Sequence, residues 1–384
     1  EVPIDRSPRT HHSSRAPGHL KLTGEMSDPN TVKILIAGDV RGNLPALYKR
    51  VEAVNASPAG PFTALFCVGN FFGESPAAAD GDGTSKDDDA THAGVRPYVD
   101  GTLTAPLPTY FIDGLPDGRE FCRDPSGVVA PNVTFLRSAK VHEIQGLRVA
   151  ALPGRHNPLV HDDESQLAAT TAERAGEYRA ADVRTLLRSN ATTETNPGGV
   201  VDLLLTNEWP RGCDHNATAA PGDAVATASA AGSPAISDVA RDVQPRYHVC
   251  GTGGCHYARE PYKNPRGHAT RLVALAPVGN DRKERWLHAL ALLPAAKQPP
   301  SALQQLPPDT TRNPYDAPPH GGPNGSGKNV NLYGRGEEFN HAGIRWEEPK
   351  AKKARMAGNV RTDPLRGDPD KTVFVRNLNF RADE

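Results

Sequence analysis

The chain has 384 residues, a formal net charge of −1 and an apolar fraction of 37 %. This length allows two or three domains of about 100–200 residues each. Gly and Pro, at 36 residues each, exceed their average share, so we expect part of the chain not to fold. A net charge near zero excludes a uniformly basic nucleic-acid binder, and no apolar run is long enough to predict a transmembrane helix. The five cysteines argue against a disulfide framework and favour a reducing compartment.

The first folded unit is predicted to begin after a polar segment, residues 1–30, which we expect to be disordered. The apolar run 32–37 predicts a buried strand, and residues 38–43 form a turn. Apolar residues at helical spacing over 44–54 then predict a helix, and a second apolar run, 64–68, predicts another strand. A strand–helix–strand unit of this kind indicates a parallel pair of strands in an α/β fold.

We expect this domain to extend over residues 31–296. A helix is predicted over 161–189, and Gln145–Gly146 predicts a hairpin turn. Residues 74–104, with seven acidic and two basic side chains, are expected to form a solvated insertion. Residues 213–238, rich in Ala, Gly, Ser and Thr, are expected to form a second, mobile insertion. Further strands are predicted over 108–112, 133–136, 141–144, 147–152, 200–205, 246–249, 270–275 and 286–293.

The composition changes after residue 296. Residues 297–370 are rich in Pro and Gly and predict a disordered linker. A basic cluster at 350–355, made of Lys350, Lys352, Lys353 and Arg355, is similar to a short nuclear localisation signal, and a solvated charge run is the alternative. Residues 371–384 begin with a predicted strand and stop within the pattern. We therefore expect the chain to be a fragment of a longer protein.

The turn at residues 38–43, Gly-Asp-Val-Arg-Gly-Asn, lies between a predicted strand and a predicted helix. A dinucleotide-binding turn is one interpretation, but the spacing Gly-x-Gly-x-x-Gly is absent. The other is the first metal loop of a calcineurin-like metallophosphoesterase, which the turn resembles. A second loop, Gly69-Asn70, follows the next predicted strand and supports the second interpretation.

Several further motifs, in the expected order, narrow the resemblance. Together they are similar to the CwfJ family of Cwf-nineteen-like, spliceosome-associated proteins, over about residues 32–316. The resemblance implies a four-layer αββα sandwich of the metallophosphoesterase type, related to the lariat debranching enzyme and partnered with it. The motifs lie at residues 67–73, 202–210, 245–248, 259–262, 268–271, 278–280 and 313–315.

The resemblance also tells which residues should hold two metal ions, and most are replaced. Asp39 is kept. The usual His is Arg41, a permanent cation without a lone pair, and the usual bridging Asp is Asn70, which brings no charge. In the debranching enzyme a loop supplies a His where this chain has Asn207, followed by Glu208. Residues 113–116 and 251–254 likewise lack the expected Asn and His ligands.

We therefore expect a phosphoesterase-like domain with no catalytic residues, no bound metal and no cofactor. Arg41 has two interpretations, an ion pair with Asp39 that fixes the loop in place of metal, or a phosphate-binding side chain for RNA. Cys250 and Cys255, with His248 and His268 nearby, also allow a zinc site, although the spacing is long and no second cysteine pair follows.

The C-terminal segment is similar to the first strand of an RNA recognition motif, truncated by the end of the chain. In such a motif an aromatic side chain stacks on a base, so the candidate RNA-binding residues are Phe374, Arg376, Asn377 and Phe380. The alternative is a short amphipathic strand of another fold.

These features together predict a non-catalytic nuclear factor that acts late in pre-mRNA splicing and in lariat turnover. Its expected partners are RNA and, by resemblance, the debranching enzyme and spliceosomal proteins; no membrane is expected. Two alternatives remain. The first is a phosphodiesterase, single-metal or metal-independent, that uses Asp39, Asn70 and Glu208. The second is an RNA-binding adaptor that uses Arg41 in the old active-site cleft.

Overall fold

The computed structural model describes residues 28–73, 92–114, 118–165, 167, 169–170, 175–190 and 199–316, and the backbone of 375–376. Within these residues no helix is long and apolar enough to cross a bilayer. All five cysteines lie in this part, and all are free thiols. Several predicted features lie outside the described residues: the segment 1–27, the basic cluster at 350–355, and the candidate RNA-binding residues Phe374, Asn377 and Phe380.

One sheet is built around the predicted strand–helix–strand unit, which is confirmed. β1 (Val32–Ala37) pairs in parallel with β2 (Ala64–Cys67), and α1 (Leu44–Asn55) connects them. The strand order is β16-β15-β1-β2-β3-β5-β4. The other members are β3 (Thr109–Phe111), β4 (Val128–Ala130), β5 (Val133–Phe135), β15 (Leu287–Leu292) and β16 (Val375–Arg376).

A second sheet has the order β12-β14-β11-β10-β7-β6, and β13 also pairs with β14. β7, β10, β11 and β14 run parallel to one another, and β12 and β13 are antiparallel to β14. β6 and β7 form the predicted antiparallel hairpin, with Gln145 and Gly146 both at positive φ. The strands are β6 (Lys140–Ile144), β7 (Leu147–Leu152), β10 (Leu203–Thr206), β11 (Tyr247–Cys250), β12 (Tyr257–Ala258), β13 (Tyr262–Lys263) and β14 (Ala269–Ala274).

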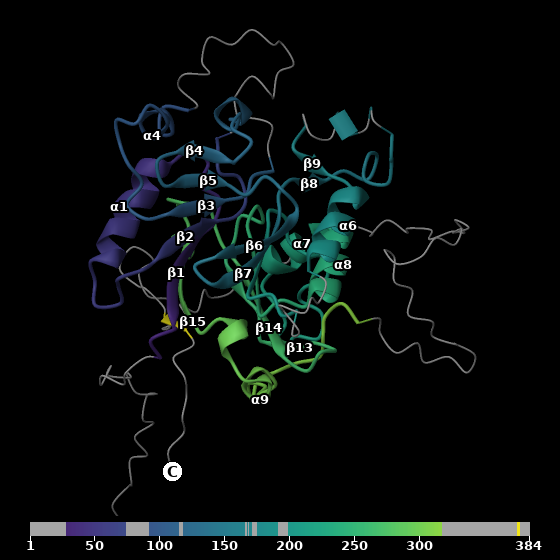
Figure 1. Ribbon diagram of the computed structural model, residues 1–384. Helices are drawn as coiled ribbons and strands as arrows, with labels where there is room; N and C mark the ends of the chain where they lie inside the picture. The colour runs from purple at the N-terminus through teal and green to yellow at the C-terminus, as the bar shows by residue number, and fades with distance from the viewer. Residues whose placement is uncertain are drawn as a thin grey trace, which may run out of the picture.

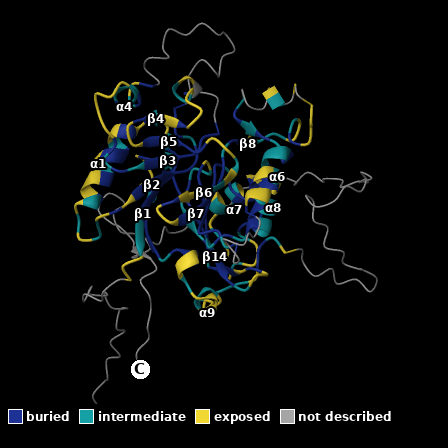
Figure 2. Cartoon of the chain, viewed as in Figure 1, coloured by how far each residue is buried: buried dark blue, intermediate teal, exposed yellow. Residues whose placement is uncertain are grey.

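The two sheets pack face to face with helices outside, which confirms the predicted four-layer αββα sandwich (Figure 1). Side chains of a strand alternate between the two faces of its sheet. Ile34 and Ile36 therefore join Leu203 and Leu205 in a core between the sheets. Figure 2 shows this interior as a continuous buried layer.

The two outer cores lie beneath the helices. Leu35 and Ala37 pack with α1 on the first sheet. On the second sheet Leu204 packs against α6 (Ala180–Ser189) and α8 (Pro234–Val243). The short elements α4 (Arg96–Val99), η1 (Arg119–Phe121), β8 (Arg155–His156), β9 (Glu177–Tyr178), α7 (Asp223–Ala231), η2 (Ala295–Lys297) and α9 (Pro300–Leu303) complete the described chain.

The expectation that residues 213–238 form a mobile insertion is wrong, because most of this segment is helical. Ala is the strongest helix former, so an Ala-rich composition suits α7. The next helix, α8, has Pro at its first position, and the side chain of Ser233 caps it by accepting a hydrogen bond from Ile236 N. Its apolar face, which includes Ile236, Val239 and Val243, is buried against the sheet.

Two other predicted boundaries also differ from the structure. Within the expected insertion 74–104, residues 92–99 pack on the domain, since Tyr98 is buried with its ring 4.9 Å from that of Tyr48, whereas residues 100–104 are exposed. The expected linker starts too early, because residues 297–316 pack on the domain. Thr311 N donates to Pro261 O at 2.8 Å, and the ring of Tyr315 meets Tyr262 edge-on at 5.7 Å. Residues 74–91 and 317–370 lie outside the described residues.

The predicted helix over 161–189 is also too long. The helix α6 begins only at Ala180, and β9 precedes it. β9 pairs with β8, so that Tyr178 is a buried strand residue opposite His156 instead of a helix residue.

Asp202, at the start of β10, connects the two sheets. Its side chain is 1 % exposed. One oxygen accepts from Arg246 Nη1 at 2.7 Å and from Ala295 N, after β15, at 2.9 Å, and the other accepts from Arg148 N at 3.0 Å. One carboxylate thus joins β7, β10, β11 and the chain that leaves the first sheet.

We predict that Asp202→Ala lowers the free energy of unfolding by about 3–5 kcal/mol, because it removes one partner of a buried ion pair and leaves the Arg246 guanidinium without its carboxylate. Urea denaturation measures this change. The control is Glu164→Ala, which breaks an ion pair whose carboxylate is 74 % exposed and should cost less than about 1 kcal/mol. Equal losses in the two variants would contradict this role of Asp202.

Candidate functional site: a metal-site remnant closed by hydrogen bonds

The candidate site lies where the carboxyl ends of parallel strands from both sheets meet, the usual position for a site in such sheets. Asp39 follows β1, Asn70 follows β2 and Asn207 follows β10. Thr252 follows β11, and its backbone N–H reaches across to Asp39 in the first sheet. The loops of the two sheets are therefore in direct contact here.

The Asp39 carboxylate is fully buried and is held by backbone amides. Oδ1 accepts from Thr252 N at 2.9 Å and from Asn70 N at 3.1 Å. Oδ2 accepts from Arg41 Nη2 at 3.3 Å. Burial raises the pKa of Asp39, against the opposing effect of these donors and of the guanidinium charge. Both carboxylate oxygens thus have protein partners.

Backbone also fills the space around Oδ1. Gly69 has a φ of +77°, and a Cβ added there would lie 1.6 Å from Asp39 Oδ1. A Cβ added at Gly251 would lie 2.7 Å from the same atom. Only residues without a side chain let both loops approach so closely.

Arg41 takes the ion-pair arrangement with Asp39. Its backbone has a positive φ of 51°, and its N–H donates to Asn70 O at 2.9 Å. The side chain is 54 % exposed, so the guanidinium lies at the surface above the buried carboxylate. Asn70 contributes to the site through its backbone, which donates to Asp39 and accepts from Arg41.

Asp113 is a site residue that the sequence analysis missed. In the sequence it belongs to a loop, residues 113–116, that lacks the expected Asn and His ligands. In the structure its buried Oδ2 accepts hydrogen bonds from Phe71 N and Phe72 N, both at 2.9 Å. The carboxylate thereby fixes the loop after β2 from the neighbouring strand, β3. Asp113 directly follows the predicted strand 108–112, and this position could have marked it in the sequence as a site residue.

Asn207 is buried and donates from Nδ2 to Gly154 O at 3.0 Å. Its Oδ1 has no hydrogen-bond partner among the described residues. Asn207 O accepts from Thr252 Oγ1 at 2.9 Å and from Gly251 N at 3.1 Å, so this loop also supports the one that reaches Asp39.

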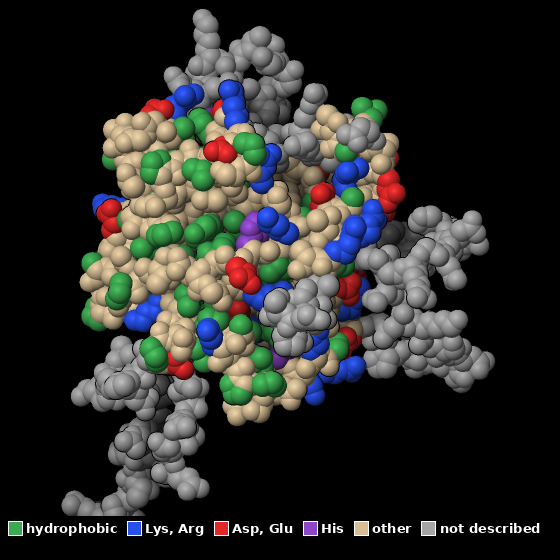
Figure 3. All heavy atoms as spheres, viewed as in Figure 1, with side chains coloured by type: hydrophobic (Ala, Val, Ile, Leu, Met, Phe, Trp, Pro, Cys, Tyr) green, Lys and Arg blue, Asp and Glu red, His purple; other side chains and the backbone are tan. Residues whose placement is uncertain are grey.

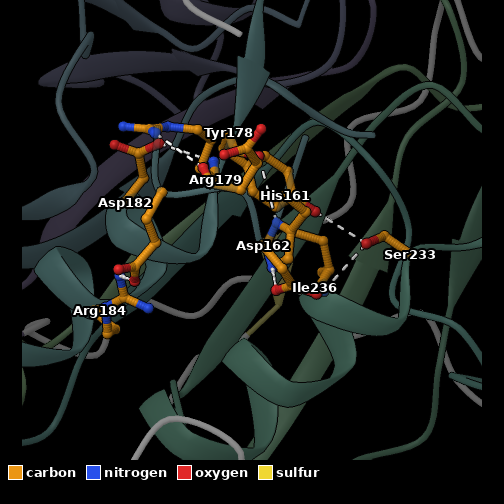
Figure 4. A network of polar contacts seen from close by, with 10 residues as sticks. His161, Asp162, Tyr178, Arg179, Asp182, Arg184, Ser233 and Ile236 are labelled. Carbon is orange, nitrogen blue, oxygen red and sulfur yellow. Dashed lines mark hydrogen bonds and ion pairs between the residues drawn. The ribbon is translucent and has the colours of Figure 1, made fainter. Parts of the chain in front are cut away.

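Glu208 belongs to a separate network. Its Oε2 accepts from His156 N at 2.7 Å and from Tyr178 Oη at 3.3 Å. Tyr178 Oη also contacts Ser233 Oγ at 2.9 Å, the side chain that caps α8 (Figure 4). Burial raises the pKa of Glu208, opposed by the His156 N–H and the Tyr178 hydroxyl. Its hydrogen bonds therefore hold loops and a helix end together.

These residues do not fit a two-metal centre. Such a centre needs ligands that hold two ions about 3.5–4 Å apart. In the described part of the chain, no three His, Cys, Asp or Glu side chains come together in a way that could hold a metal ion. The unpartnered Asn207 Oδ1 is a single neutral donor, and the retained carboxylate, Asp39, already accepts hydrogen bonds at both of its oxygens.

The zinc alternative has no geometric support in this region either. His248 Nε2 is 2.9 Å from Thr206 Oγ1, and His268 Nε2 is 2.7 Å from Gln244 O. Among the described residues, Cys250 and Cys255 belong to no group of three His, Cys, Asp or Glu side chains that could hold a metal ion.

A hollow of about 560 Å³ lies beside the remnant site, against α7. The Trp209 indole forms one wall, is 2 % exposed and stacks on Tyr257 at 6.0 Å. Glu208, Thr252 and Arg282 contribute polar groups.

On the face shown in Figure 3, acidic and basic side chains of the described residues are interspersed. The described side chains on this face therefore form no broad surface of one sign for a polyanion.

His248, beneath the site, makes stability depend on pH. The imidazole is fully buried, and burial lowers its pKa to about 3. An unfolded chain binds this proton near pH 6.5, so the unfolded state holds more protons between about pH 6.5 and 3. Stability should therefore fall as the pH drops through this window.

We predict that His248→Gln reduces this pH dependence by up to about 1.4 kcal/mol per pH unit, since one proton is no longer taken up on unfolding. Urea denaturation at pH 4, 5, 6 and 7 measures the slope. The exposed His215→Gln is the matched control and should leave the slope unchanged. An unaltered slope in His248→Gln would show that this imidazole does not control acid stability.

No family model matches the chain. Zinc finger CCCH domain-containing protein 59 of Oryza sativa subsp. japonica is 35 % identical over 305 residues, covering 74 % of this chain and 44 % of that protein. CWF19-like protein 1 of Homo sapiens is 31 % identical over 291 residues, covering 74 % and 48 %. The CWF19-like protein 1 homolog of Drosophila melanogaster is 34 % identical over 283 residues, covering 69 % and 44 %.

The chain thus spans about half the length of the curated relatives it matches. A solved purple acid phosphatase, PPD1 from yellow lupin, aligns with 65 % of this chain and 44 % of its own at 10 % identity and a TM-score of 0.30, too weak to support an inference. The sequence relatives, the ordered motifs and the four-layer fold agree with one another. Over 69–74 % of its length, the chain is a homologue of curated proteins named CWF19-like.

Proposed function

We propose that this chain is a non-catalytic, splicing-related factor whose phosphoesterase-like domain serves as a docking module. The observation that carries the proposal is the Asp39 carboxylate, whose two oxygens accept hydrogen bonds from Thr252 N, Asn70 N and the Arg41 guanidinium. A carboxylate committed in this way holds loops together instead of holding metal ions.

Charge supports the same conclusion. Two divalent cations need several anionic ligands near them, and two-metal hydrolysis uses these ions to stabilise the attacking and the leaving oxygen. Here Asp39 faces a permanent cation, Arg41, at 3.3 Å, and the expected bridging carboxylate is the neutral Asn70. A dication at this place would be repelled by the guanidinium.

The family relation motivates the proposed setting. We propose that the chain acts in the nucleus, late in pre-mRNA splicing, with RNA, spliceosomal proteins and the lariat debranching enzyme as partners. The proposed nuclear signal at 350–355 and the proposed RNA-binding segment at 371–384 would bring the docking domain to RNA and raise its local concentration there.

The metal prediction is tested by restoring the expected ligands. We predict that the melting temperature of the unaltered protein does not rise with Mn²⁺ or Zn²⁺, and that metal-treated protein retains less than one ion per chain after dialysis. The double variant Arg41→His, Asn70→Asp should gain a metal-dependent rise, because it removes the repelling cation and adds an anionic bridge. Thermal shift and elemental analysis give the two readouts.

An assay of RNA hydrolysis distinguishes the docking proposal from the rival function, a phosphodiesterase. The phosphodiesterase alternative predicts hydrolysis of branched RNA by the unaltered protein, lost in a folded Asp39→Asn variant. Stoichiometric metal together with this loss would overturn the docking proposal. A debranching assay addresses the docking role itself: we expect the chain to change the rate at which the debranching enzyme opens branched RNA and to open none by itself.

The exposure of Arg41 favours one second candidate, an RNA-binding adaptor. A guanidinium that is 54 % exposed can offer its outer N–H groups to a phosphate while one stays with Asp39. On this account, Arg41→Ala lowers the salt dependence of RNA affinity by about one phosphate contact, whereas Arg188→Ala, an exposed residue on α6, does not. Identical salt slopes for Arg41→Ala and the unaltered protein would remove this candidate.

A further inference from the structure

β15 is the outermost long strand of the first sheet. It pairs along its whole length with β1 on one side, from Val32↔Leu292 to Ala37↔Leu287. On the other side only β16 is present, in parallel, with Val375 opposite Ala289 and Arg376 opposite Leu290. Figure 1 shows β16 as the short yellow strand beside β15. Without it, the outer backbone groups of β15 would have no strand partner.

Proteins protect sheet edges with short strands, bulges, charges or coverings. The other described edges show such features. β4 has three residues and an irregular register against β5, β12 has two residues, and β6 carries the charged residues Lys140 and Glu143. β15 has six residues, Leu-His-Ala-Leu-Ala-Leu, without a charged side chain or an interruption. This edge is therefore the one that most needs a covering strand.

We propose that the outer edge of β15 is a strand-docking site, and that the chain's own C-terminal segment at Val375–Arg376 occupies it. Backbone hydrogen bonds supply the affinity in such β-augmentation. A pairing of two residues is short, so the docked segment is expected to exchange with an undocked state.

The chain is long enough for this contact. Asp316 is the last described residue before the segment, and 58 residues, 317–374, separate it from Val375. Fully extended, they span about 190 Å, and even in helical form they span about 87 Å. A linked segment acts at an effective concentration of the order of millimolar.

Docking has a consequence that rests on the proposed function. A strand paired with β15 cannot at the same time pair within a separate RNA-binding sheet. The segment then either covers the phosphoesterase-like domain or takes part in RNA binding, and RNA would compete with the docked state.

Hydrogen exchange of the full chain without RNA tests the docking, independently of any splicing role. Proline lacks the backbone N–H and breaks strand pairing, so Val375→Pro should expose the outer edge of β15. We expect the outward amides within 287–292 to exchange about tenfold faster, while those of β1 stay protected. Ala351→Pro is the matched control and should leave β15 unchanged.

A peptide of residues 371–380 provides the second measurement. At millimolar concentration it should restore protection of β15 in Val375→Pro, and a scrambled peptide should not. Unchanged exchange of β15 in Val375→Pro, or no restoration by the peptide, would overturn the proposal. Failure of RNA to release the segment, with docking intact, would instead count only against the proposed function.

Discussion

A single buried carboxylate sets the character of the site. Asp39 lies where loops of both sheets converge, and its oxygens accept from backbone amides of Asn70 and Thr252 and from the Arg41 side chain. In a two-metal enzyme the cations would hold these loops together. Here hydrogen bonds and one guanidinium do so, and Gly69 and Gly251 let the loops close over the carboxylate. The fold is kept, and hydrogen bonds take up the carboxylate that metal chemistry would use.

Other carboxylates of the domain have the same structural role. Asp113 holds the amides of Phe71 and Phe72, and Asp202 joins the second sheet to the end of β15. Glu208, which the resemblance placed among the remnant metal positions, is bound instead to His156 N and the Tyr178 hydroxyl. Because a buried anion is costly without donors, each of these groups fixes the backbone that supplies them.

The sequence predicted the fold well where local pattern and tertiary packing agree. The strand–helix–strand unit and the hairpin at Gln145–Gly146 follow from apolar spacing and turn chemistry. The structure of residues 213–238 and 297–316 could not be predicted from the sequence. Their composition resembles that of loops, although tertiary contacts order them. At the site, the ligand changes could be named from motifs. The amides that replace metal, such as Thr252 N, could not, since backbone donors leave no trace in residue identity.

The central claim is that the site around Asp39 cannot hold a pair of divalent cations. Anomalous diffraction from crystals of the full chain grown with Mn²⁺ tests it most directly. The account predicts no anomalous peak within about 3 Å of Asp39, with the bond from Thr252 N to Asp39 Oδ1 retained. Two peaks about 3.5–4 Å apart, with Asp39 between them, would contradict it.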